Sequence, residues 1–116
     1  MKTSALFVIR SDPRRGGRPA EALRIAAGVG AWKKVDVTIY LRDAAVLVLG
    51  EQAEKLPDGE DYARYLPILL DFGRPVYVQE GAAALAELGR ATLPFQEISD
   101  EQLADLAAAR ACLLLF

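Results

Sequence analysis

The sequence predicts an α/β protein in which helices cover both faces of a parallel sheet. Short apolar runs alternate with longer segments whose apolar residues recur every three or four positions. This alternation is typical of strands joined by crossover helices. The 116 residues are 53% hydrophobic and 26% charged, as in compact folded proteins. A chain of this length builds one hydrophobic core, so residues 1–116 are predicted to be a single domain.

Five segments are predicted to be strands, because each is a short apolar run bounded by polar residues, Gly or Pro. They are Ser4–Arg10, Val35–Leu41, Val76–Val78, Phe95–Ile98 and Ala111–Phe116. The last segment, ACLLLF, is almost continuously apolar, which predicts a buried strand. Cys112 is therefore expected to be a buried packing residue of low nucleophilicity, because burial disfavours the thiolate.

Helix signals separate these strands. Pro19 stands at a helix-opening position, and the helix that it opens is expected to end near Trp32. One face of this helix carries small or apolar residues at the required spacing: Leu23, Ala26, Ala27 and Gly30.

Three further helices are predicted along the chain. One begins at Asp61 and contains Pro67, where we expect a kink or a restart. An alanine-rich helix follows Gln79–Gly81. The last one begins after Ser99, which has the spacing of a capping box with Gln102.

The apolar segment Asp43–Gly50, DAAVLVLG, is predicted to be a short helix ending at Gly50. Apolar residues would surround this helix, whereas the sheet of the domain can cover one side of it. We therefore expect a subunit interface here, formed by Val46, Leu47, Val48 and Leu49. The alternative is that the segment extends the preceding strand or lies under the polar loop 51–60.

The composition excludes several kinds of site. The chain has no histidine, which excludes Ser-His-Asp and Cys-His catalytic systems and histidine metal sites. One cysteine allows neither a disulfide framework nor a thiolate cluster and suits a reducing cytoplasm. A net charge of −2 argues against nucleic-acid binding, and the longest apolar run, 44–49, is too short to cross a membrane. We expect no cofactor, no metal and a cytoplasmic location.

Polar residues gather where the predicted strands end, which in parallel sheets is the usual place for ligands. The loop SDPRRGGRP follows the first strand, and its amides and arginines suit a small anion. It lacks both GxGxxG and the P-loop lysine. The candidate ligand-binding residues are Arg10, Ser11, Asp12, Arg14, Arg15, Arg18, Arg42, Gln79, Glu80 and Gly81.

Each of these residues also has a purely structural interpretation. The loop would then be an exposed basic connection with two glycines for turning. Glu80 would favour the positive end of the following helix, and Gln79 would be a solvated strand end. Arg10 with Asp12, and Arg42 with Asp43, would form surface ion pairs.

In its order of motifs the chain resembles the DsrE/DsrF-like family of small sulfur-relay proteins, which includes the TusB, TusC and TusD subunits. The motifs are SALFVIRSDP, PAEALRIAAGVGAW, VDVTIYLRDAAVLVLGE, LLDFGRPVYVQEGAAALAELG and ISDEQLADLAAARACLLLF. The resemblance covers almost the whole length. It implies a three-layer α/β/α fold with a five-stranded parallel sheet in the order 4-3-2-1-5, and homo- or hetero-oligomers with related small subunits.

The resemblance also implies where sulfur chemistry would take place. Active members carry a sulfur-accepting cysteine at the end of the third strand, which falls at Gln79, Glu80 or Gly81 here, where no cysteine stands. We therefore expect a non-catalytic structural or regulatory subunit. The alternative is a small anion-binding domain or an enzyme that uses the carboxyl edge of strands one and three. A sulfur carrier acting through Cys112 is the least favoured hypothesis.

Overall fold

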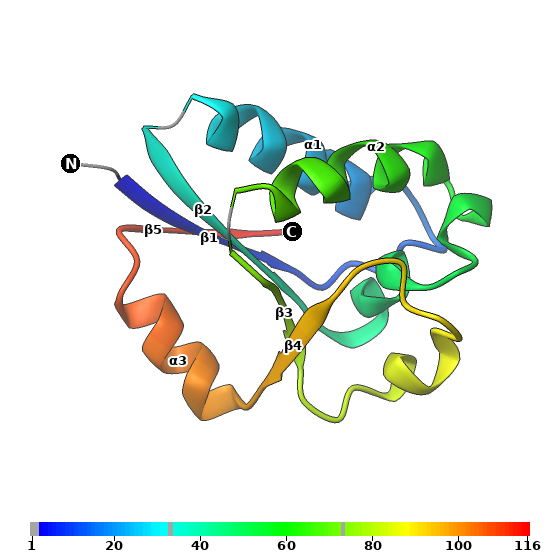
Figure 1. Ribbon diagram of the computed structural model, residues 1–116. Coiled ribbons are helices and arrows are strands. Elements are labelled where there is room, and N and C mark those ends of the chain that lie inside the picture. The colour runs from blue at the N-terminus through cyan, green and yellow to red at the C-terminus, as the bar shows by residue number, and fades with distance from the viewer. Residues whose placement is uncertain (1–2, 33, 73) are drawn as a thin grey trace.

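The computed structural model describes residues 3–32, 34–72 and 74–116, and its centre is a five-stranded parallel sheet (Figure 1). The strands are β1 (Thr3–Ile9), β2 (Val35–Leu41), β3 (Val76–Gln79), β4 (Phe95–Ile98) and β5 (Cys112–Leu115). They lie in the order β4-β3-β2-β1-β5, and each neighbouring pair is parallel. The predicted fold class and strand order are confirmed.

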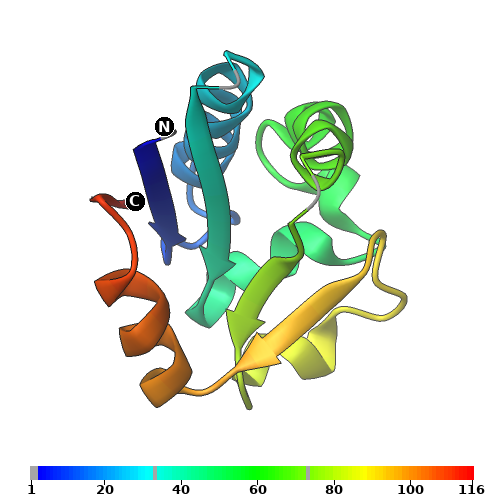
Figure 2. The same ribbon diagram turned by 60° about the vertical axis from the view of Figure 1, so that its left-hand side comes forward.

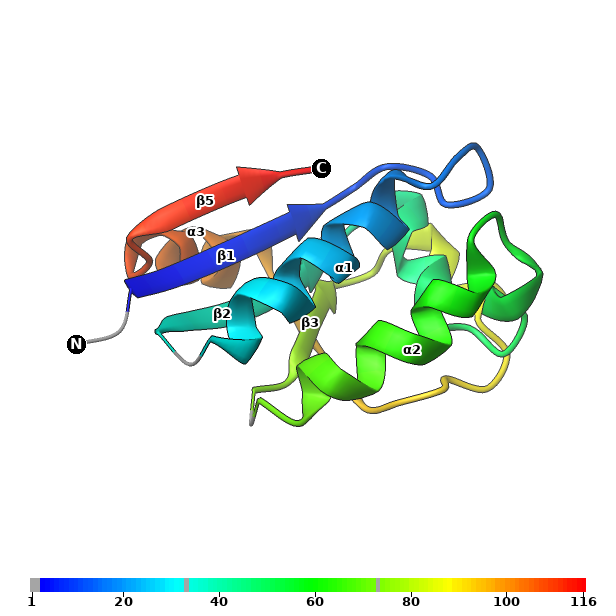
Figure 3. The same ribbon diagram turned by 90° about the horizontal axis from the view of Figure 1, so that it is seen from above.

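Among the described residues, three α-helices form the outer layers. Helices α1 (Arg18–Ala31) and α2 (Gly59–Leu70) pack against each other on one face of the sheet, and α3 (Asp100–Ala108) lies on the opposite side (Figures 2 and 3). The larger buried cluster lies on the α1 and α2 side, whereas Leu6, Val8, Tyr40 and Ile98 form the core beneath α3. In the described part of the chain, none of the helices is both long and apolar enough to span a bilayer.

Helix α1 has the signals that the sequence predicted. A proline occupies its first turn, and its buried face includes Leu23, Ala26 and Gly30. The glycine permits the contact with α2, because a Cβ at Gly30 would lie 2.2 Å from the ring of Phe72. Helix α2 continues through Pro67 as one element, so the predicted restart is wrong.

The other two predicted helices differ in outcome. Ser99 and Gln102 form the expected capping box, with the Gln102 amide 3.1 Å from Ser99 Oγ and the Ser99 amide 2.8 Å from Gln102 Oε1. The alanine-rich segment forms just a short 3₁₀ helix, η3 (Ala83–Glu87). Two glycines in the left-handed region, Gly81 and Gly89, lie on either side of η3 and interrupt a longer helix.

The expected subunit interface at residues 46–49 is corrected by the structure. The segment is a short 3₁₀ helix, η1 (Asp43–Leu49), in which Val46, Val48 and Leu49 have no exposed surface. It packs against η3 and the short helix η2 (Ala53–Lys55), so the chain itself covers the side away from the sheet. Of the four expected interface residues, Leu47 keeps partial exposure.

The structure also corrects the prediction that the last strand is buried. β5 is an edge strand, and Leu113 and Leu115 are 51% and 65% exposed on the α3 side of the sheet. Cys112 is exposed as well. An apolar run predicts burial only if both faces of the strand are covered, and α3 contributes no buried residue to that cover.

Candidate functional site

Arg10 and Arg42 lie side by side at the carboxyl edge of the sheet. Ile9 of β1 is in register with Leu41 of β2, and the Arg42 amide donates to the Ile9 carbonyl at 3.0 Å. Arg10 and Arg42 each follow these paired residues directly. The ends of two neighbouring strands therefore place two guanidinium groups at one edge, as expected from their positions in the sequence.

These two arginines border a pocket of about 470 Å³, which we call the arginine pocket. Its lining residues are Val8, Arg10, Ser11, Arg18, Arg42, Leu115 and Phe116. Four of the ten expected ligand-binding residues are thus brought together. The sequence did not indicate its apolar wall, because the contribution of β5 depends on that strand lying next to β1.

Hydrogen bonds and stacking around Phe116 hold this pocket together. Both the amide and the hydroxyl of Ser11 donate to the Phe116 carbonyl, and the Phe116 amide donates to the Val8 carbonyl at 2.9 Å. The Phe116 ring stacks on Phe7 with centroids 5.8 Å apart, and the Arg18 guanidinium carbon lies 5.8 Å from the Phe116 ring centroid. This ring therefore positions Arg18 at the wall of the pocket.

Arg14 and Arg15 belong to a separate surface cluster around Asp12. Arg14 forms a two-pronged pair with Asp12, with Nη2–Oδ2 at 2.9 Å and Nε–Oδ1 at 3.0 Å, and Arg15 lies 3.8 Å from the same carboxylate. The hydrogen bond from the Arg14 side chain lowers the pKa of the Asp12 carboxyl. The expectation that all the loop arginines share one anion site is therefore wrong, since Asp12 already engages two of them.

The junction after β3 lies apart from the arginine pocket. Gln79 Oε1 accepts a hydrogen bond from the Asp43 amide at 3.0 Å, and the Gly81 amide donates to Glu97 at 3.3 Å. Glu80 is exposed beside them. We expected one ligand between the 11–18 loop and this junction, but β2 separates β1 from β3 in the sheet. The structure thus divides the expected site in two.

The hydroxyl of Tyr40 is a polar group between these two parts. It is buried and has no hydrogen-bond partner among the residues that the structure describes. Burial raises the pKa of this phenol, and the charges of Arg42, Asp100 and Asp43 act on it from nearby. In the sequence Tyr40 is the one tyrosine of the strand VDVTIYL, and nothing there distinguishes it from an ordinary aromatic residue of the core.

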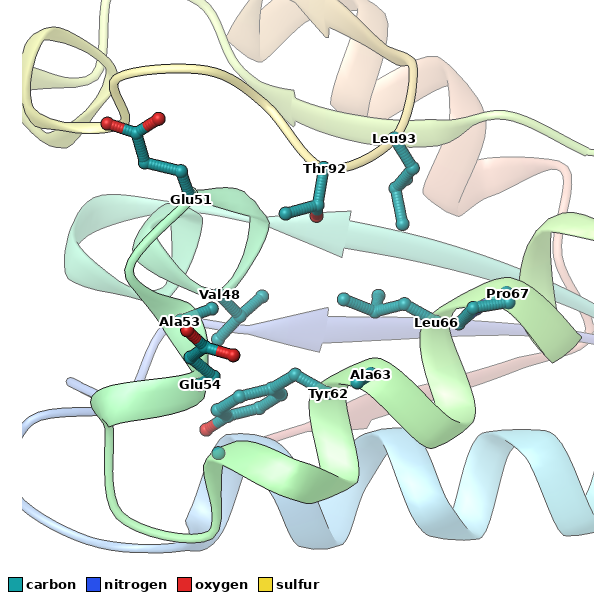
Figure 4. A pocket seen from close by; sticks show the side chains of 12 residues that line it. Val48, Glu51, Ala53, Glu54, Tyr62, Ala63, Leu66, Pro67, Thr92 and Leu93 are labelled. Atoms are coloured by element: carbon teal, nitrogen blue, oxygen red, sulfur yellow. The ribbon is translucent and has the colours of Figure 1, made fainter.

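A second pocket, of about 200 Å³, lies on the face of the sheet that carries α2 (Figure 4). Val48, Leu66 and Leu93 make it largely apolar, and Thr92 closes one side through its bond to the Leu49 carbonyl at 3.2 Å. In Figure 4 the Glu51 carboxylate points away from the cavity. No local pattern in the sequence indicates this pocket, because its walls come from three separate segments of the chain.

Comparisons with known proteins place the chain by its fold. No family model matches the sequence, and no match is found among curated proteins. Among solved structures, the chain is similar to the ychN protein from E. coli, with a TM-score of 0.77 and 20% sequence identity over 100% of both chains. At this identity the likeness concerns the fold. The chain therefore shares the fold of the ychN protein, with a five-stranded parallel sheet in the order 4-3-2-1-5.

Proposed function

We propose that this protein is a non-catalytic, DsrE/DsrF-like subunit of sulfur-relay type that does not itself accept sulfur. The observation that supports the proposal is the residue at the carboxyl end of β3, where the family resemblance implies a sulfur-accepting cysteine. Gln79 stands there with its side chain bonded to the Asp43 backbone amide. A side-chain amide has neither the nucleophilicity nor the redox chemistry of a thiolate.

Cys112 is badly placed to replace that thiol, although it is exposed. It is the first residue of β5 and pairs with Ala5, so it lies toward the amino end of the strands. Two strands, β1 and β2, separate β5 from β3. At about 4.8 Å per strand, Cys112 is roughly 14 Å from the β3 end across the sheet, with a further offset along the strands. We place the protein in the cytoplasm, where a free exposed thiol stays reduced.

Sulfur transfer to this protein can be tested directly by intact mass. The folded protein would be incubated with a cysteine desulfurase and cysteine, next to the variant Cys112→Ser. We expect no stoichiometric gain of one sulfur atom in either protein. A full gain in the wild type that disappears in Cys112→Ser would overturn the proposal. Partial labelling that denaturation increases would instead indicate ordinary thiol chemistry of the unfolded chain.

A subunit of this type needs a surface for association, and we propose the exposed side of β5. Leu113, which is 51% exposed, projects there beside an open strand edge, and α3 leaves it uncovered. Parallel strands are normally covered on both faces, so a second copy of this chain is the occupant that we propose.

The oligomeric state tests this surface. Leu113→Glu should shift the protein to monomers in sedimentation velocity, while far-UV circular dichroism stays unchanged. Ile68→Glu is the matched control, because Ile68 is also partly exposed, at 39%, but lies on α2 across the sheet. A wild-type protein that is monomeric at high concentration, or equal effects of both variants, would contradict the proposed surface.

A further inference from the structure

Three arginine side chains line the arginine pocket, and the fold pairs one of them with a carboxylate. Arg10 and Arg18 make no ion pair with any residue that the structure describes, and Arg42 meets Asp43 at 3.5 Å. Among the described residues, no carboxylate side chain lines the pocket. The adjoining groove also contains Arg18 but is lined by Glu21, Asp58 and Asp61, so it does not suit an anion.

The sheet places the backbones of two of these arginines side by side. Because Ile9 and Leu41 are paired, the residues that follow them start about 4.8 Å apart across the sheet. Arg10 and Arg42 both line the arginine pocket, so their like charges repel each other there. Arg42 is partly buried, which weakens the screening of its charge by solvent. An oxyanion between the guanidinium groups would relieve this repulsion and accept their planar, paired N–H donors.

The remaining walls indicate what such an anion would be attached to. Ser11 is already committed, because its amide and hydroxyl both donate to Phe116, so it shapes the pocket without offering those donors to a ligand. Val8, Leu115 and Phe116 add apolar surface beside the arginines. Leu115 is 65% exposed, and a ligand that covered it would gain from its burial.

We propose that the arginine pocket binds a small organic phosphate: an oxyanion held by Arg10, Arg18 and Arg42, with an apolar group packed on Leu115 and the Phe116 edge. This site is independent of whether the protein accepts sulfur, and it uses neither Cys112 nor the β3 end. It also differs from the site expected between strands one and three, since it lies where β2, β1 and β5 meet.

Binding can be measured by calorimetry at constant ionic strength with three probes: inorganic phosphate, phenyl phosphate and phenol. We expect phenyl phosphate to bind more tightly than inorganic phosphate, and phenol not to bind. The double variant Arg10→Ala/Arg42→Ala should lose roughly tenfold or more in affinity for both phosphates. The control Arg15→Ala/Arg90→Ala removes the same charge from exposed residues outside the pocket and should bind like the wild type.

The apolar part of the proposal has its own pair of variants. Leu115→Ala should weaken phenyl phosphate but leave inorganic phosphate unchanged, whereas Ile68→Ala, at an exposed apolar residue of α2 outside the pocket, should change neither. In the wild type, phenyl phosphate should shift the backbone amide resonances of Arg10, Ser11 and Arg42. Absence of phosphate binding by the wild type, shifts confined to the pocket of Figure 4, or equal losses in both arginine double variants would overturn the proposal.

Discussion

The side-chain carbonyl of Gln79 accepts a hydrogen bond from the backbone amide of Asp43 at 3.0 Å. This bond joins the end of β3 to the first residue of η1. Asp43 has a φ of 53°, in the left-handed region that residues other than Gly, Asn and Asp rarely adopt. Gln79 therefore holds a turn of unfavourable backbone conformation next to Arg42.

Gln79→Ala should destabilise the protein by about 1 kcal/mol, because it leaves the Asp43 amide without its partner. Urea unfolding followed by circular dichroism would measure the change. The neighbouring substitution Glu80→Ala is the control, since Glu80 is exposed, and it should change the free energy of unfolding by less than about 0.5 kcal/mol. Equal effects of the two substitutions would show that the hydrogen bond contributes little.

Two glycine substitutions should have opposite effects. Gly28 lies in α1, where an added Cβ would have no atom within 4 Å, so Gly28→Ala should stabilise by about 0.5 to 1 kcal/mol through helix propensity. At Gly59 a Cβ would lie 2.3 Å from the Glu54 carbonyl oxygen, and this backbone cannot move aside freely. Gly59→Ala should therefore cost about 1 to 3 kcal/mol. Melting temperatures measured side by side would test both signs.

The free energy of unfolding should fall at alkaline pH because the protein contains buried tyrosines. Burial, together with the charges of Asp58 and Asp61, raises the pKa of Tyr62 from 10.0 to about 12. The neutral phenol stabilises the folded state fully below pH 10, and this contribution is lost as pH rises from 10 towards 12.

Replacing this phenol should change the alkaline behaviour and leave neutral stability almost intact. Like the Tyr40 hydroxyl, the Tyr62 hydroxyl has no hydrogen-bond partner in the described part of the chain, so Tyr62→Phe should be nearly neutral at pH 7. It should retain about 1 to 2 kcal/mol more stability than the wild type near pH 12. Parallel pH dependences of the two proteins in urea unfolding would contradict this assignment.

Ser99→Ala should destabilise α3 by about 1 kcal/mol, because it removes one half of the capping box. The effect should be local, since α3 has no fully buried residue to anchor it. Hydrogen exchange of the α3 amides should therefore accelerate more than that of the β2 amides. Ser4→Ala is a useful comparison, as the Ser4 hydroxyl accepts from the Ala111 amide at the other end of the same connection.

Local patterns were sufficient to predict most elements of this fold. Pro19 and the spacing from Leu23 to Gly30 indicated α1, and Ser99 with Gln102 indicated the start of α3. These signals act between residues a few positions apart, so they can be recognised without knowledge of the tertiary structure. The strand order came from the family resemblance, because no local pattern determines which strands become neighbours.

The errors arose where distant segments decide burial. The apolar segment Val46–Leu49 resembles an uncovered surface in the sequence, but η3 covers it from about forty positions further along the chain. β5 shows the reverse case, since an apolar run has the same appearance in a central strand and in an edge strand. The arginine pocket was predicted only in part. The positions of Arg10 and Arg42 could be predicted because each follows a strand, whereas Leu115 and Phe116 join the pocket through the pairing of β5 with β1.

The position of β1 has a consequence for the order in which the protein is completed during translation. Among the five strands of the sheet β1 is synthesised first, yet one of its two neighbours is β5, and Ser11 bonds to a residue 105 positions later. While the ribosome is still making the C-terminal segment, β1 has a free hydrogen-bonding edge, and Leu6 and Val8 lack the cover of α3. In an unfinished chain, the unpaired edge and apolar side chains of β1 can therefore associate with other nascent chains. Chains stalled before residue 109 should accordingly bind chaperones. The same chaperones should not bind the folded protein.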